Sequence, residues 1–79
     1  MQVIILKKEV HNGSNNIVPP EILSLTMSKK EKDIYKKQQE EYYKEMFYNK
    51  YIEDGYAPFE AKEKSDTIKV YLSYKELNK

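Results

Sequence analysis

The chain has 79 residues, 39% of them hydrophobic, and its 14 cationic side chains, all lysine, against 13 acidic ones give a formal net charge of +1. A chain of this length forms one domain that buries roughly 60% of the surface its unfolded form exposes, so its stability margin is small. The absence of cysteine excludes disulfides and thiolate metal sites. We therefore expect a single small domain over residues 1–79, supported by packing or by association.

The sequence also bears on location and on nucleic-acid binding. No apolar run approaches the roughly 20 residues needed to span a bilayer, and Met1–Leu6 lacks the basic flank and long core of a signal peptide. We expect a cytoplasmic protein that does not contact membranes. Arginine is absent, which removes the planar fork most used for phosphate and guanine recognition.

The first 25 residues predict strand and turn structure. Met1–Val10 is rich in β-formers and predicts a strand, and His11–Asn16 consists of turn-forming residues. Ile17-Val18 predicts a short returning strand, which Pro19-Pro20 would confine to a sheet edge because proline donates no ladder hydrogen bond. For Glu21–Leu25 we expect one helical turn.

A long helix is predicted for residues 28–54. Ser28-Lys29-Lys30-Glu31 matches the capping box, in which the Ser and Glu side chains each accept a hydrogen bond from a free backbone N–H. Lys29–Asp54 contains neither Gly nor Pro, and Gly55 stands where a left-handed C-cap residue is wanted. The helix is amphipathic in its first half, with Glu40 assigned to its solvated face.

The last third of the chain predicts a short helix at residues 58–65 and a strand at residues 67–75. Pro58 suits the first position of a helix, and Thr67–Tyr74 alternates apolar and polar residues with the period of a half-buried strand. An alternative extends the short helix to Leu77. That alternative uses the helically spaced residues Ala61, Ser65, Ile68 and Leu72.

These elements predict an α+β fold, in which the N- and C-terminal strands form a small sheet packed against one long and one short helix. The alternative is a mostly α fold, a helical hairpin with an N-terminal β-strand. Whether the terminal strands pair parallel or antiparallel stays open at this stage.

No residue pattern indicates catalysis or a cofactor. His11 is the only histidine, and its position beside Asn12-Gly13 predicts an exposed turn residue. The carboxylates around Glu40 and Glu45 are interleaved with lysines, as on a solvated helix face. The two glycines, Gly13 and Gly55, stand in unrelated contexts, so no phosphate-binding loop exists. We expect no enzyme activity, no cofactor and no metal.

The tyrosines are the strongest candidates for function. Tyrosine is amphipathic and enriched in interfaces, and eight of them exceed what a small core hides. The plainer interpretation is that half of them pack on the sheet with their hydroxyls at its rim. The residues we expect to contact a partner are Tyr35, Lys36, Lys37, Tyr42, Tyr43 and Met46.

Two functional classes remain open. In the first, the tyrosine-bearing helix face or an edge strand docks onto another protein, or onto a second copy as a homodimer. In the second, lysines flanking stacked tyrosines hold single-stranded nucleic acid. The basic patch of that second class would be Lys29, Lys30, Lys32, Lys36 and Lys37. Acidic residues mixed through this patch favour the protein partner.

Two resemblances accompany this interpretation. Met1–Val10, followed by Gly13, resembles the opening strand of the ninth large-subunit bacterial ribosomal protein, but Asn15–Pro20 replaces the glycine- and lysine-rich loop of that family, so its RNA-binding role is not carried over. The lysine-, tyrosine- and asparagine-rich, cysteine-free composition resembles small accessory proteins of bacteriophages and mobile elements, many of which inhibit one host protein. This second resemblance implies a regulator in the cytoplasm of a host cell.

Overall fold

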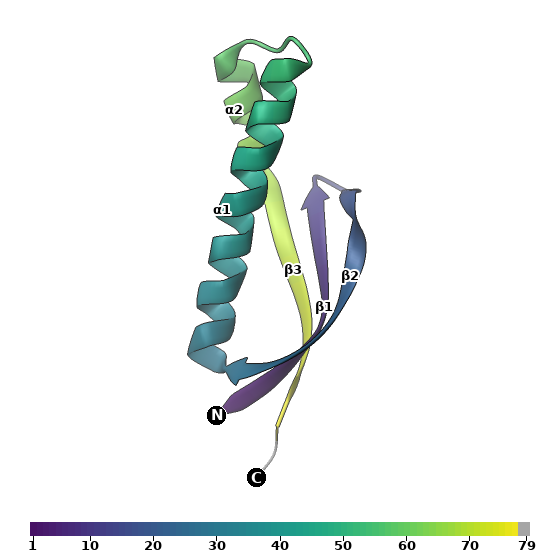
Figure 1. Cartoon of the computed structure of the whole chain (residues 1–79), viewed down its shortest axis with the longest axis vertical. Coiled ribbons are helices and arrows are strands. Elements are labelled where there is room, and N and C mark those ends of the chain that lie inside the picture. Colours follow the sequence, from purple (N-terminus) through teal and green to yellow (C-terminus); the bar gives the residue numbers. More distant parts are fainter. Residues whose placement is uncertain (78–79) are drawn as a thin grey trace.

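Residues 1–77 of the computed structural model form an antiparallel sheet with two helices on one side (Figure 1). In chain order the elements are β1 (Gln2–Asn12), β2 (Asn15–Ser28), α1 (Lys29–Glu53), α2 (Pro58–Asp66) and β3 (Ile68–Glu76). The strand order is β2-β1-β3, and both pairings are antiparallel. The predicted α+β class, with terminal strands in one sheet against a long and a short helix, is confirmed.

The N-terminal strand β1 lies in the centre of the sheet. Its side chains Val3, Ile5 and Val10 are buried, as the β-rich sequence predicts for a strand with a partner on each side. A two-residue turn joins β1 to β2, and Gly13 takes a φ of 66° there. Positive φ at the first turn position followed by negative φ at Ser14 fits a type II′ turn, whose twist matches that of paired strands. The predicted hairpin tip is confirmed.

Strand β2 corrects two predictions. It runs from Asn15 to Ser28, so the predicted short strand at Ile17-Val18 is too short and the helical turn predicted at Glu21–Leu25 is wrong. Pro19-Pro20 falls in a register irregularity between the pairs Lys8–Glu21 and Val10–Val18. Because β2 is an edge strand, this irregularity absorbs the two missing N–H groups and the strand continues beyond them.

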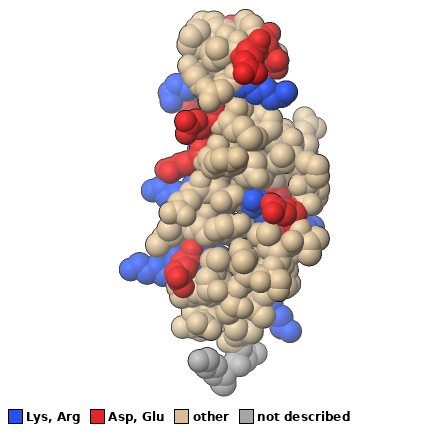
Figure 2. All heavy atoms as spheres, viewed as in Figure 1, with Lys and Arg blue, Asp and Glu red and all other residues tan. Residues whose placement is uncertain are grey.

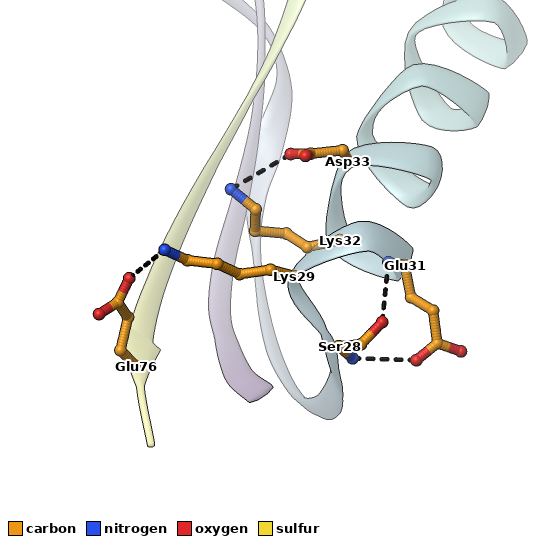
Figure 3. A network of polar contacts seen from close by, with 6 residues as sticks. All are labelled: Ser28, Lys29, Glu31, Lys32, Asp33 and Glu76. Atoms are coloured by element: carbon orange, nitrogen blue, oxygen red, sulfur yellow. Dashed lines mark hydrogen bonds and ion pairs between the residues drawn. The ribbon is translucent and has the colours of Figure 1, made fainter. Parts of the chain in front are cut away.

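Helix α1 begins and ends where its capping residues predict. The Ser28 hydroxyl accepts a hydrogen bond from the Glu31 N–H at 3.0 Å, and the Glu31 carboxylate accepts one from the Ser28 N–H at 2.9 Å (Figure 3). At the other end Gly55 has a φ of 102° and donates its N–H to the Ile52 carbonyl. The helix is about 37 Å long at 1.5 Å per residue, and its predicted bounds are confirmed to within one residue.

The C-terminal third is a helix followed by a strand. Pro58 lies in the first turn of α2, and the chain then leaves the helix for β3 at Ile68. Ile68 and Val70 are fully buried while Lys69 and Tyr71 are exposed, which is the alternation of a half-buried strand. The alternative of one helix continuing to Leu77 is therefore wrong.

The hydrophobic core lies between the second half of α1 and the strands β1 and β3. Val10, Phe47, Ile68 and Val70 form its centre. Half-buried side chains that pack against this centre are Ile17, Val18, Tyr43, Tyr51 and Leu72. The molecule is elongated, with extents of 52 × 20 × 17 Å, and α1 lies nearer to β3 than to β2 (Figure 1).

Candidate interaction site

The two outer edges of the sheet differ in how far α1 covers them. An edge strand presents backbone N–H and C=O groups that no neighbouring strand satisfies. On β3, the carboxylate of Glu40 in α1 accepts a hydrogen bond from the Val70 backbone N–H at 3.0 Å. We call the outer side of β3 the covered edge, because a helix side chain occupies the backbone group that another strand would use.

A second set of contacts ties the start of α1 to the same strand. Lys29 forms an ion pair with Glu76 of β3 (Figure 3). The Lys32 ammonium lies 4.1 Å from the centre of the Tyr74 ring. The hydrogen bond and charge of Glu76 raise the pKa of Lys29, and Lys29 in turn lowers the pKa of Glu76. The covered edge is therefore held at both ends of the strand.

The outer side of β2, which we call the open edge, lacks such contacts. Within residues 1–77, no side chain of α1 bonds to the backbone of β2 between Asn15 and Met27. This strand carries one charged residue, Glu21, in 14 positions, and Ile22 is 78% exposed. Pro19-Pro20 interrupts its middle, but the stretch from Glu21 to Met27 has none of the lysines or prolines that usually block an edge.

Lys8 of β1 lies between α1 and β2 and contacts both elements. This side chain is buried, and its ammonium donates to Gln39 Oε1 at 2.9 Å and pairs with Glu21 at 3.1 Å. Burial lowers the pKa of Lys8, but hydrogen bonds to Glu21 and Tyr43 outweigh that effect, so the net pKa lies above its ordinary value. Because the Glu21 carboxylate neutralises the Lys8 ammonium, Lys8 offers no free positive charge to a partner.

The structure separates the six residues that the sequence predicted for partner contact. Tyr35 lines a hollow together with Met27 of β2, and Tyr42 and Met46 follow it on the same flank of α1 at spacings of seven and four residues. Tyr42 is 59% exposed. Tyr43 points inward, with its ring 5.1 Å from the Lys8 ammonium.

Lys36 and Lys37 do not belong to the aromatic flank. At 100° per residue, they lie about 120° and 140° around α1 from Tyr42. Their role as a rim of the tyrosine site stays a prediction; both side chains are exposed. Sequence adjacency to Tyr35 suggested the grouping, and helical geometry opposes it.

Two shallow hollows along α1, of which the first also includes residues of β2, define what we call the α1–β2 groove. The first is lined by Thr26, Met27, Glu31, Ile34, Tyr35 and Gln38. The second, farther along α1, is lined by Tyr42, Glu45, Met46 and Asn49. Both are open to solvent and combine apolar and aromatic surface with a few polar groups. Such a combination suits a peptide or a protein surface.

The charges of α1 are sorted around its circumference. Each of the seven lysines of the helix lies about 80° or more from the direction of Tyr42, whereas Glu31, Glu45 and Glu53 lie within about 60° of it. Neither hollow is lined by a lysine. Figure 2 shows lysines and acidic side chains interspersed on a mainly uncharged surface, in the view of Figure 1. The α1–β2 groove is therefore aromatic and acidic.

Two polar residues differ from their predicted positions. His11 lies within β1 and is half-buried against Tyr71, at 4.9 Å between ring centres, so its prediction as an exposed turn residue is wrong. Glu40, assigned to the solvated face, is half-buried and bonds to β3. Its spacing of three and seven residues from Tyr43 and Phe47 places all three on one helix face, a signal that could have revealed it.

The described residues show no arrangement suited to a metal ion: within residues 1–77 no three His, Cys, Asp or Glu side chains are grouped closely enough. In the same part of the chain, no helix combines the length and apolarity needed to cross a membrane.

Comparisons with known proteins give no further guide, since no family model, no curated protein and no solved structure matches this chain.

Proposed function

We propose that this protein is a non-enzymatic protein–protein interaction module that binds its partner through the α1–β2 groove. In its sharpest form the proposal is a regulator or inhibitor, encoded by a phage or mobile element, that acts on a host protein in the host cytoplasm. The observation that carries it is the open edge of β2 beside an aromatic helix flank, while the other edge is covered.

The energetics of a small domain support this proposal. Tyr42 and Met46 expose apolar surface that the monomer leaves in water, and neither contributes to the core cluster. Tyrosine is among the residues that contribute most to binding when a partner desolvates it. A partner seated in the groove would bury this surface and would add to the small stability margin of a 79-residue chain.

The positions of the lysines favour a protein partner over single-stranded nucleic acid. Stacking platforms for nucleic acid place cations beside the aromatic rings. Here Lys29 and Lys32 are engaged with β3, and Lys36 and Lys37 lie on other sides of α1 from Tyr42. The carboxylates of the groove would repel a phosphate backbone.

Affinity capture from a host lysate tests the proposal, with the intact protein as bait and with nuclease-treated and untreated arms. We expect capture of a protein that survives nuclease treatment. Tyr42→Ala should weaken it at least tenfold, as expected for a contact worth about 1.4 kcal/mol or more. Tyr71→Ala is the matched control, since Tyr71 is similarly exposed but lies in β3. Capture that disappears with nuclease, or that is equally insensitive to both substitutions, contradicts the proposal.

A further inference from the structure

We infer that the partner enters the α1–β2 groove as an extended segment that adds to β2 as a further strand, and that this segment carries lysine or arginine among alternating apolar side chains. The inference rests on the proposed function and specifies the chemistry of the partner. It combines the open edge of β2, which selects the backbone conformation, with the acidic lining, which selects the charge.

The open edge selects a strand. Alternate residues of Glu21–Met27, a stretch in which the β1–β2 register shifts at Leu23-Ser24, present backbone N–H and C=O groups on the side away from β1. Main-chain hydrogen bonds to such an edge bind extended peptides in many recognition domains. On β3 strand addition is opposed at Val70, whose N–H is bonded to Glu40, and α1 lies nearer to that strand than to β2. Within the described sheet, β2 is therefore the edge with no such obstruction from α1.

The added strand would contact a wall of side chains formed by one flank of α1 and by Met27 of β2. Successive side chains of a strand point to opposite faces, so every second side chain of the segment would face α1. Tyr35 and Met27 lie at one end of that wall, and Tyr42 and Met46 at the other. Apolar side chains at alternate positions would bury this surface, and the positions between them would face the sheet side that exposes Ile22.

The charge of the lining selects a basic segment. Glu31 and Glu45 line the two hollows, whereas Glu21 on β2 is already paired with Lys8 and adds little net charge. No lysine lines either hollow. A segment with lysine or arginine would meet these carboxylates, whereas an acidic segment would be repelled.

The same charges disfavour a second copy of this chain as the occupant. Strand β2 contains no lysine, so pairing two β2 strands around a two-fold axis would bring a second α1 flank with its Glu45 to the groove and no cation to meet it. Strand β3 carries Lys69 and Lys75, but its outer edge is already covered by Glu40. Pairing of β2 with a second β2 therefore lacks charge complementarity. Pairing of β2 with β3 of a second copy would meet the edge at which Glu40 bonds to Val70.

The test is a selection from a random library of displayed ten-residue peptides against the full-length protein. We expect enriched peptides to alternate apolar residues, to carry at least two lysines or arginines, and to lack central prolines. The best synthetic peptide is then measured by fluorescence anisotropy. Glu45→Lys should weaken it about fivefold, as expected for reversing one exposed contact, whereas Glu63→Lys on α2 should leave its affinity unchanged.

Amide hydrogen exchange shows where the peptide lies. When the peptide is bound, alternate amides between Glu21 and Met27 should exchange more slowly. In a proline scan of the peptide, proline should abolish binding at every second peptide position and be tolerated at the positions between. Acidic or charge-neutral consensus peptides, protection confined to other elements, or a β2-mediated dimer of the free protein in sedimentation would each overturn the inference. If β2 gains no protection while Tyr42→Ala still abolishes capture of a host protein, the proposed function stands and the strand-addition inference fails.

Discussion

The covered edge at β3 and the open edge at β2 belong to the same small sheet, yet one is closed by helix side chains and the other is not. Glu40 bonds to the backbone of β3, and Lys29 pairs with Glu76 at the far end of that strand. On the β2 side, the nearest part of α1 presents Tyr35 and Tyr42 across solvent-open hollows. Helix α1 therefore bonds to one edge strand of the sheet and leaves the other edge to solvent.

The dimensions of the elements explain why the second edge stays open. A helix with its side chains is about 10 Å across, and strands lie about 4.8 Å apart, so one helix covers about two strands of the sheet. Helix α1 covers β1 and β3, where Phe47 meets Ile68 and Val70. Of β2, Ile17 and Val18 pack against that core and Thr26 and Met27 share a hollow with α1, but its outer edge is left uncovered by the described residues.

The largest expected effect compares two adjacent residues of α1, one on each side of the helix. Phe47 is buried against β1 and β3, whereas Met46 faces the groove and is 37% exposed. Phe47→Ala should lower the free energy of unfolding by about 3–5 kcal/mol, and Met46→Ala by less than about 1 kcal/mol. Urea denaturation measures both. Equal losses would show that the groove side of α1 is also core.

The next effect tests the contact that closes the covered edge. Glu40→Ala removes the acceptor of the Val70 N–H, and losing a hydrogen bond to a charged group should cost about 2 kcal/mol. Glu41→Ala, at the adjacent exposed position, should change stability by less than about 0.5 kcal/mol. Thermal and urea denaturation measure both variants. Equal losses of unfolding free energy would show that the Glu40–Val70 hydrogen bond does not stabilise the fold.

A smaller effect concerns lysines placed on each edge. Ser24 in β2 and Ser73 in β3 are both exposed serines of edge strands. Lysine at either position should change stability by less than about 0.5 kcal/mol. Ser24→Lys should nevertheless weaken partner capture severalfold, because edge lysines obstruct strand addition, while Ser73→Lys should not. Equal binding by the two variants would remove the functional distinction between the edges.

The smallest effect is the pH dependence of the contacts at the start of α1. The pKa of Glu76 is lowered by Lys29, and the pKa of Glu31 is lowered by its hydrogen bonds with Ser28. A carboxyl group with a lowered folded-state pKa stabilises the protein above its unfolded pKa, near 4.5, and that contribution is lost as the pH falls through the folded value. Glu76→Gln should make the free energy of unfolding fall less steeply as the pH is lowered through this range. A variant that loses stability in acid as steeply as the parent would show that the ion pair contributes nothing.

Local signals in the sequence predict one part of this architecture well. Ser28 with Glu31 and the glycine at position 55 define the ends of α1 because capping acts within a few residues. The period-two pattern of β3 is likewise readable, since Ile68 and Val70 alternate with exposed residues. These features depend on neighbours in the sequence, so they need no knowledge of the tertiary structure.

The candidate site depends on distant contacts, and there the sequence is less informative. Strand β2 is long because it pairs with β1, and Pro19-Pro20 conceals that pairing in the local pattern. Glu40 appears solvated until β3 is placed beside it, and Lys36 falls outside the groove because α1 is rotated to cover β3. Tyr35, Tyr42 and Met46 are predictable as one flank of α1, because helical spacing alone places them together; their contact with a partner stays a prediction.

Residue-resolved amide hydrogen exchange of the free protein tests the contrast between the two edges most directly. The account predicts slow exchange for the Val70 amide, whose N–H is bonded to Glu40, and fast exchange for the outward-facing amides between Glu21 and Met27. Comparable protection on both strands would contradict the account, because it would mean that β2 is already covered.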